Sequence, residues 1–322
     1  MSELTAPKPG DAVELRGEFR NLELAEFPEI RAMVDCRNFV GEGPIWQPLD
    51  GSIWWVDVFA PAIYRLDTAS GAVSHRPLPK RAAAVVPRSG GGVVVVLRSA
   101  LAALETIDGE VRYLAIENFE LNRFRFNDAK VDDRGRVWVG TFDPAVTALD
   151  GTLRCIGGTP LAMSAPFDRG MGVSNGIGWS PDRRTMYFTD TLAKLIYAYD
   201  FDLDSGTASN RRVCVKPKAA AGALDGPDGL AVDRDGNVWS AQFGSWRIDC
   251  YAPNGTLLRS VRMPTARPTS CIFGGKDLST LYVTTATMLL TTEELAAQPY
   301  AGSLLVLDVG TAGTPVGSFV GA

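Results

Sequence analysis

Four polar residues occupy one recurring position in this sequence, namely Glu42, Asn127, Asn175 and Asp228. Asn127 and Asp228 each lie eleven residues before a tryptophan, whereas Glu42 and Asn175 lie twelve residues before an aromatic residue. In each case a small-residue turn carries the polar side chain and opens a short apolar run. Two carboxylates and two carboxamides offer the oxygen ligands that Ca²⁺, Mg²⁺ and Mn²⁺ prefer. If these side chains converge, the pattern predicts a divalent metal site.

Convergence of the two carboxylates would be unfavourable without a cation. An ionised carboxylate that is buried without a partner costs several kcal/mol, and a bound divalent ion removes that cost. Zn²⁺ and Fe²⁺ are alternatives, because carboxylates can also hold these ions. The protein ligands are too few to fill the coordination shell of a hard ion, so we expect positions that are open to water and substrate.

A purely structural role for the same residues is the alternative. Asn-Gly and Asp-Gly are common turn formers, and one such residue at a strand entry is more often a turn device than a ligand. The recurrence in four repeats favours the ligand interpretation. The equivalent positions of two weaker repeats carry Ala82 and Thr269, which would not bind a cation.

Arg125 lies two residues before Asn127, and alternation along a strand places such a pair on one face. Its guanidinium could therefore hold substrate hydroxyls or a carbonyl, whereas a surface ion pair is the alternative. We expect Asp57, Asp128 and Asp190 to be hydrogen-bond partners within hairpins or between repeats rather than catalysts.

The repeated unit predicts the fold. Each copy runs through about four apolar residues, turns at an Asp, Gly or Pro cluster and resumes with an aromatic-rich strand, which is typical of a β-hairpin. Units of roughly 40 to 50 residues with room for four strands are typical of propeller blades. We therefore predict an all-β fold, a six-bladed β-propeller with four-stranded blades around a central metal-binding channel. The copies begin at Gly41, Arg81, Phe126, Ser174, Pro227 and Pro268.

The repeats leave no room for a second folded unit, so we expect residues 1–322 to form a single domain. The N-terminal segment from about residue 10 to 36 is expected to supply the strand that closes the last blade. One helix is predicted in TTEELAAQP, where Thr291 and Glu294 match a capping box and Pro299 ends the run.

Composition limits the partners. The 322 residues are 46% hydrophobic, and they include 32 Lys and Arg and 37 Asp and Glu, with no block of basic residues. This distribution argues against nucleic acid or an anionic membrane as partner and favours a small polar molecule. No apolar stretch suits a membrane span or an export signal, so we expect a cytoplasmic protein.

The scarcity of histidine excludes several catalytic sites. The single histidine, His75, cannot supply a Ser-His-Asp set, a Cys-His pair or a multi-histidine zinc site. The five cysteines are far apart and show no C-x-x-C spacing, so we expect buried free thiols. Any chemistry must then use carboxylates, amides and a metal ion.

Five segments resemble the family of gluconolactonases, regucalcin (senescence marker protein) and luciferin-regenerating enzymes: GEGPIW, RFND, SNGIGWSPD, PDGLAVD and TSCIFGG. The resemblance covers about residues 36–310 in the same order. It implies that Glu42, Asn175 and Asp228 bind the metal and that Arg125 and Asn127 contact the substrate. Asn127 is thereby assigned to substrate more than to metal. Residues 143–171 depart from the family pattern, which leaves the choice of substrate open.

The resemblance implies a lactonase that hydrolyses sugar lactones, such as gluconolactone, xylonolactone or arabinonolactone, to aldonic acids. We expect one divalent ion, Ca²⁺ first, with Zn²⁺, Mn²⁺, Mg²⁺ or Fe²⁺ as alternatives, and Asp228 as the residue that takes a proton from the attacking water. Two other functions are considered: a phosphotriesterase-like hydrolase on the same metal site, and a non-catalytic calcium-binding regulatory protein.

Overall fold

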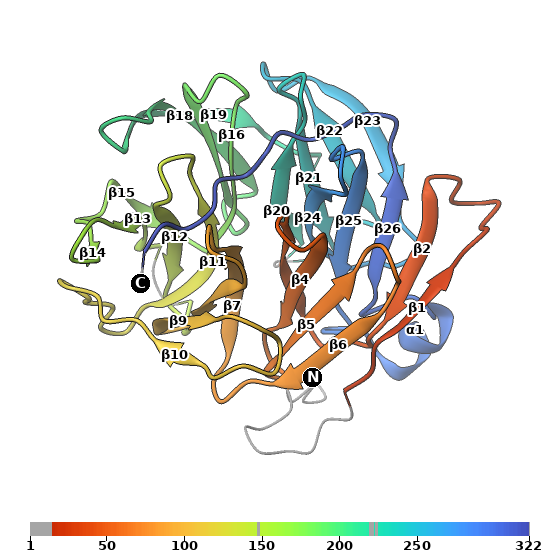
Figure 1. Ribbon diagram of the computed structural model, residues 1–322. Coiled ribbons are helices and arrows are strands. Elements are labelled where there is room, and N and C mark those ends of the chain that lie inside the picture. Colours follow the sequence, from red (N-terminus) through yellow and green to blue (C-terminus); the bar gives the residue numbers. More distant parts are fainter. Residues whose placement is uncertain (1–14, 147–148, 219–221, 223–224, 322) are drawn as a thin grey trace.

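Six small β-sheets surround a central axis in the computed structural model, which describes residues 15–146, 149–218, 222 and 225–321 (Figure 1). Blade 1 consists of β3 (Gly41–Gln47), β4 (Ser52–Asp57), β5 (Ala62–Asp67) and β6 (Val73–Pro77). Blade 2 consists of β7 (Ala82–Pro87), β8 (Val93–Leu97), β9 (Ala100–Leu104) and β10 (Arg112–Tyr113). Blade 3 consists of β11 (Arg125–Val131), β12 (Val137–Phe142), β13 (Gly151–Gly157), β14 (Ala162–Met163) and β15 (Asp168–Met171).

The second half of the ring follows the same order from the axis outward. Blade 4 consists of β16 (Ser174–Trp179), β17 (Thr185–Asp190), β18 (Leu195–Asp202) and β19 (Thr207–Val215). Blade 5 consists of β20 (Gly226–Val232), β21 (Val238–Phe243), β22 (Arg247–Tyr251) and β23 (Leu257–Arg262). Blade 6 consists of β24 (Pro268–Gly274), β25 (Thr280–Thr285), β26 (Leu304–Asp308), β2 (Ile30–Asp35) and β1 (Glu18–Asn21).

The innermost strands close the ring. Each contacts the next in the order β3, β7, β11, β16, β20 and β24, and β24 contacts β3. Strands of one blade pair antiparallel, and the blades meet through apolar side chains that alternate with the pleat. The expected six-bladed β-propeller is confirmed, with a fifth strand added to blades 3 and 6.

The N-terminal segment joins the last blade. β2 pairs with β26, with Ala32 opposite Val306, and β1 adds to the outer edge of β2. Of the expected closing segment, residues 10–14 lie outside the described residues. The helix α1 (Thr292–Ala297) is inserted between β25 and β26, and both hydrogen bonds of its predicted capping box are formed by Thr291 and Glu294.

The recurring Asp-x-x-Gly turns explain why the repeat is visible in the sequence. Asp132 accepts hydrogen bonds from the backbone of Arg134 and Arg136 and from Nε1 of Trp138 at 2.8 Å. Asp233 likewise accepts from Nε1 of Trp239 at 2.9 Å. One aspartate therefore closes the hairpin turn and satisfies the buried indole of the next strand.

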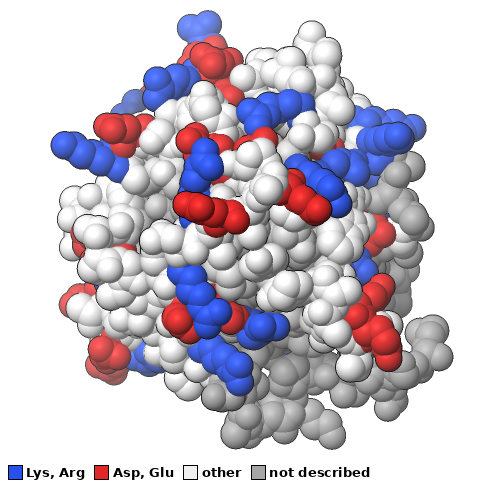
Figure 2. Space-filling view, turned by 90° about the vertical axis from the view of Figure 1, so that its right-hand side faces the viewer, with Lys and Arg blue, Asp and Glu red and all other residues white. Residues whose placement is uncertain are grey.

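Charged side chains of both signs lie on the surface (Figure 2), and most cysteines are buried. Figure 2 shows acidic and basic side chains interspersed on one face. Within the described residues, no helix is long and apolar enough to cross a membrane. The cysteines form no disulfide. Cys214 is partly exposed, and the other four are buried, namely Cys36, Cys155, Cys250 and Cys271.

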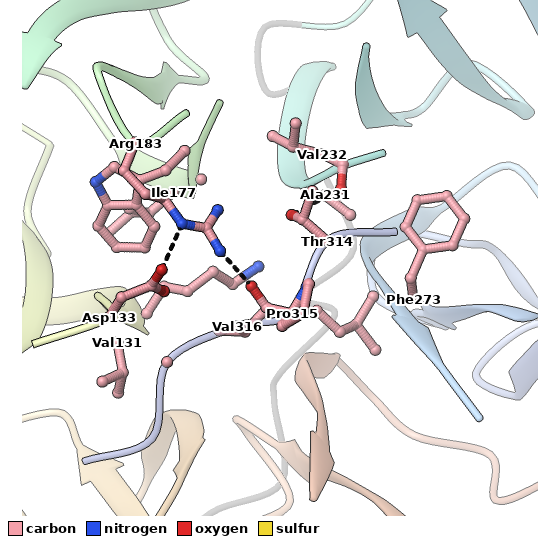
Figure 3. Close-up of a pocket in the computed structure, with 15 residues that line it drawn as sticks. Val131, Asp133, Ile177, Arg183, Ala231, Val232, Phe273, Thr314, Pro315 and Val316 are labelled. Carbon is pink, nitrogen blue, oxygen red and sulfur yellow. Dashed lines mark hydrogen bonds and ion pairs between the residues drawn. The ribbon is translucent and has the colours of Figure 1, made fainter. Parts of the chain in front are cut away.

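A C-terminal strap, residues 311–320, closes the end of the ring where the innermost strands finish (Figure 1). Its Thr314 backbone amide donates to Val232 O at 3.2 Å, and its Phe319 amide donates to Pro87 O at 2.7 Å. Figure 3 shows Arg183 between Asp133 and the strap, where it donates to Pro315 O at 2.7 Å. A cavity of about 20 Å³ lies beneath the strap, and a larger one of about 230 Å³ borders Thr314, Pro315 and Val316.

Phe319 fixes the strap to the ring. Its ring is 1% exposed and packs in the cluster that contains Ala84, Val86 and Val131. Phe319→Ala should lower the free energy of unfolding by about 3 kcal/mol, because removal of a buried aromatic ring leaves a cavity. Val320→Ala is the matched control, since Val320 is 62% exposed and should change the value by less than about 0.5 kcal/mol. Equal denaturation midpoints for the two variants would contradict the sealing role.

Candidate active site

The four recurring polar residues occupy equivalent positions at the other end of the ring. In each blade, the residue just before the polar one pairs with a residue of the second strand. That partner always lies three residues after the aromatic landmark. The pairs are Gly41 with Asp57, Phe126 with Thr141, Ser174 with Asp190 and Pro227 with Gln242. The same register places Thr269 at this position in blade 6, as expected. In blade 2 it places Ala83 there, so the expected equivalence of Ala82 is wrong by one residue.

A β-bulge lies at this position in every innermost strand. The register shifts fall between Glu42 and Ile45, Ala82 and Ala84, Phe126 and Asp128, Ser174 and Ile177, Pro227 and Leu230, and Pro268 and Ser270. Bulges redirect side chains and are frequent beside active sites. The Asn-Gly and Asp-Gly pairs are therefore parts of strand bulges and not hairpin turns.

The glycines of these pairs let neighbouring blades approach. A Cβ at Gly176 would lie 2.7 Å from the carbonyl oxygen of Asp228, and a Cβ at Gly229 would lie 2.0 Å from Oγ of Ser270. Both distances are too short for any side chain. Glycine is therefore needed so that the polar residue before it can reach the axis beside its neighbour.

The orientation of Asn175 follows from its hydrogen bonds. Its Nδ2 donates to Oγ1 of Thr191 at 2.7 Å, and that hydroxyl donates to Pro227 O at 2.7 Å. A hydroxyl has one proton, so Thr191 can only accept from Asn175. The amide nitrogen must face Thr191, and Oδ1 of Asn175 faces away from it. Thr191 thus links the blade of Asn175 to the blade of Asp228.

Asn127 supports Asn175 from the other side. Its Nδ2 donates to Oδ1 of Asn175 at 2.9 Å and to Ser174 O at 2.8 Å. These bonds use both amide protons, which leaves Oδ1 of Asn127 as the atom for a further ligand. The structure therefore brings Asn127 and Asn175 into direct contact, as convergence on one axis requires.

The two carboxylates are destabilised in their charged form. Asp228 is 7% exposed, and its Oδ1 is buried without a hydrogen-bond partner among the described residues. Burial raises its pKa well above the usual value, and the charge of Asp128 adds to this. Burial also raises the pKa of Glu42, and the charges of Asp228 and Asp128 raise it further, against one hydrogen bond from the Gly43 amide.

A third carboxylate belongs to this group. Asp128 was expected to support a hairpin, as Asp57 and Asp190 do through backbone amides. Instead, Asp128 is buried in the innermost strand and accepts from the Ala129 amide. Burial raises its pKa to about 6, although nearby Lys130 opposes the shift. Lys130 donates to Leu230 O at 3.0 Å and also lines the small cavity below the strap.

These residues fit a hard divalent cation. Among the described residues no group of three or more His, Cys, Asp or Glu is placed to hold a metal. The candidate set instead combines two carboxylates, Glu42 and Asp228, with the amide oxygen of Asn175. The unpartnered Oδ1 of Asp228 lacks a counter-charge, and oxygen ligands of this kind suit Ca²⁺ better than thiolate-seeking ions.

The orientation of Arg125 differs from the one expected from strand alternation. The bulge between Phe126 and Asp128 breaks the alternation that would place Arg125 and Asn127 on one face. The guanidinium donates to Phe124 O at 2.6 Å and to Asn122 O at 3.3 Å, and no ion pair holds it in the described part of the chain.

Sequence reasoning missed Thr191 and the axial position of Asp128. Thr191 directly follows the second strand of blade 4, where blade 1 has Val58, so no repeat marks it. Asp128 stands beside Asn127, and simple alternation directs neighbouring side chains to opposite faces. The bulge register bears on Asp128, whereas Thr191 is identified only by its hydrogen bonds to Asn175 and Pro227.

Comparisons with known proteins show what this chain is similar to. The family model described as "SMP-30/Gluconolactonase/LRE-like region" matches residues 40–287. Regucalcin from Danio rerio is 34% identical over 91% of this chain and 99% of that protein. 6-Deoxy-6-sulfogluconolactonase from Pseudomonas putida is 34% identical with the same coverage of both chains. The crystal structure of a calcium-binding protein, regucalcin from Agrobacterium tumefaciens, has the same fold, with a TM-score of 0.80, 24% identity and coverage of 88% and 95%.

The hydrogen bond from Asn175 to Thr191 can be tested through metal affinity. Thr191→Val should weaken Ca²⁺ binding by about tenfold or more, because an outer partner that orients a ligand contributes this much. Thr191→Ser should retain the affinity. Thr189→Val is the control, since the Thr189 hydroxyl is buried without a partner in the described structure. Calorimetric titration with equal affinities for Thr191→Val and Thr189→Val would contradict the role.

The raised pKa values of Glu42 and Asp228 predict a pH-dependent stability of the metal-free protein. A carboxyl group whose folded-state pKa exceeds its unfolded value of about 4 stabilises the fold fully below pH 4. That stability is lost as the pH rises through the folded-state pKa. In chelator, Asp228→Asn should therefore gain in Tm over the unsubstituted protein between pH 5 and pH 8. A difference in Tm that does not vary with pH would refute the shift.

Proposed function

Because the chain belongs to the SMP-30/gluconolactonase/LRE-like family, we propose that it hydrolyses sugar lactones to aldonic acids at the axial site. The observation that carries the proposal is the buried, unpartnered carboxylate oxygen of Asp228 beside Asn175 and Glu42. A relative of 34% identity named 6-deoxy-6-sulfogluconolactonase supports a lactone as substrate. Gluconolactone, xylonolactone and arabinonolactone are the substrates to be compared first.

Glu42, Asn175 and Asp228 would hold one divalent ion. Ca²⁺ is the ion we propose, and Mg²⁺, Mn²⁺, Zn²⁺ and Fe²⁺ are the alternatives for such an oxygen set. When bound, such an ion supplies Lewis-acid polarisation of the lactone carbonyl. The hydrogen bonds of Thr191 and Asn127 orient the Asn175 oxygen for this purpose.

Asp228 acts as general base. Its carboxylate takes a proton from a water molecule, the water oxygen bonds to the lactone carbonyl carbon, and the ring C–O bond breaks. The released alkoxide takes a proton, which gives the hydroxy acid. Asn127 through Oδ1 and Arg125 through its guanidinium would orient the sugar hydroxyls.

A calcium-binding regulatory protein is the second candidate function. It is favoured by the relative named regucalcin and by a cation site whose ligands need no substrate. It predicts Ca²⁺ binding without ring opening. No feature of the described site specifically favours a phosphotriesterase-like reaction. Phosphotriesters therefore serve as the substrates with which lactones are compared.

Replacement of the base should abolish turnover. Asp228→Asn should lower kcat for gluconolactone at least about 100-fold, which is the usual contribution of a general base. Asp277→Asn, at an exposed position, is the control and should retain activity. Ring opening is followed by acid release after chelator treatment and return of one metal at a time. Near-normal lactonase activity of Asp228→Asn would refute the assignment, and hydrolysis of a phosphotriester in preference to lactones would refute the substrate class.

A further inference from the structure

Three arginines gather where blades 2 and 3 meet, at the same end of the ring as the axial site. Arg81 directly precedes β7, Arg98 directly follows β8, and Arg125 begins β11. Their backbones form a continuous path, since the Arg98 amide donates to Arg81 O at 3.0 Å and the Phe126 amide donates to Arg98 O at 3.0 Å. Asn127 is two residues further along β11, so this arginine cluster borders the proposed substrate position.

Aromatic rings hold two of these guanidinium groups in place. Arg81 lies 4.8 Å from the ring centre of Phe59. Arg98 lies 5.7 Å from the same ring and 4.8 Å from that of Phe142. Such contacts fix the position of a guanidinium and leave its charge uncompensated. The cluster is therefore a packed arrangement of side chains from blades 1, 2 and 3.

No acidic residue neutralises the arginine cluster in the described residues. None of the ion pairs of that part of the chain includes Arg81, Arg98 or Arg125, whereas Arg267 at the start of blade 6 pairs with Asp225 at 2.7 Å. Burial and the charges of Arg81 and Arg125 together lower the pKa of Arg98 to about 10, so the Arg98 guanidinium remains a cation at neutral pH.

Two donors of the cluster also lack an acceptor. The Nε atoms of Arg81 and Arg98 are buried and have no hydrogen-bond partner among the described residues. Buried polar atoms of native proteins are normally satisfied, so an unsatisfied pair beside a substrate site points to a bound group. An anion with several oxygens would supply both the missing acceptors and the missing charge.

The arginine cluster is distinct from the cation site. Arg81 and Arg98 lie at the ends of β7 and β8 in blade 2 and Arg125 begins β11 in blade 3, whereas Glu42, Asn175 and Asp228 lie in the innermost strands of blades 1, 4 and 5. The site therefore has an acidic part for a cation and a basic part for an anion. A substrate that carries both a lactone and a separate anionic group would match both parts.

We propose that Arg81 and Arg98, together with Arg125, bind an anionic substituent of the sugar lactone, of the sulfonate, phosphate or carboxylate class. The inference rests on the proposed lactonase function and adds the substrate class. Binding of the substituent would place the lactone carbonyl toward Glu42, Asn175 and Asp228. Guanidinium groups suit this role because each offers several N–H donors to one oxyanion.

The first test compares substrates. The unsubstituted enzyme should show kcat/KM at least about 100-fold higher for 6-phosphogluconolactone than for gluconolactone, since two charge-assisted contacts are gained. Arg98→Gln and Arg81→Gln should each reduce this ratio by about 10- to 100-fold, mainly through KM. Arg98→Lys keeps the charge and should reduce the ratio less. Arg184→Gln, at an exposed position, is the control and should leave the ratio unchanged.

The second test is direct binding and needs no turnover. Asp228→Asn protein should bind 6-phosphogluconate in a calorimetric titration, and the double variant with Arg98→Gln should bind it at least tenfold more weakly. Inorganic phosphate should bind far more weakly than the sugar phosphate. Equal affinities for the two would overturn the proposal, because the cluster would then bind a free anion.

The outcomes separate the two proposals. Hydrolysis of neutral lactones with no preference for anionic ones would overturn the arginine subsite and leave the lactonase function standing. If no lactone is hydrolysed, the lactonase function fails, and loss of sugar-phosphate binding in the Arg98→Gln double variant would still support the subsite.

Discussion

The burial of acidic side chains on the axis of the ring is the interaction on which the site depends. Asp228 is buried and Glu42 is partly buried, so water stabilises their charges poorly, and Asp128 adds a third carboxylate. A closed ring of innermost strands brings them together from blades far apart in sequence. The bulge in each strand turns the side chain inward, and Gly176 and Gly229 permit the close approach of the next blade. The fold thus holds a group of carboxyl groups whose ionised form a divalent cation would stabilise.

The two ends of the ring have different roles. The strap closes the far end through backbone hydrogen bonds and the buried ring of Phe319, and a small cavity lies beneath it. Lys130 lies between that cavity and the carboxylates, where its charge partly offsets Asp128. The other end presents the carboxylates on the axis and the arginine cluster beside them. This separation of charge gives a small, polar substrate one defined orientation.

The sequence allowed prediction of the fold and of the positions that converge, because every blade repeats the same turn and the same aromatic landmark. Glu42, Asn127, Asn175 and Asp228 could be aligned by counting residues from that landmark. The side chains that orient them could not be found in this way. Thr191 has no counterpart in blade 1, and Asp128 turns inward only because a bulge interrupts the strand beside it. The same bulge register moved the blade 2 equivalent from Ala82 to Ala83. The arginine cluster joins residues of two blades, and only spatial proximity reveals it.

The central claim is that one cation binds on the axis between Glu42, Asn175 and Asp228. Crystals grown with Mn²⁺ in place of Ca²⁺ and measured at the manganese absorption edge test this directly. The account predicts a single strong anomalous peak within about 2.6 Å of a carboxylate oxygen of Glu42, Oδ1 of Asn175 and Oδ1 of Asp228. An axial site without a peak, or a peak bound only by surface carboxylates, would contradict it.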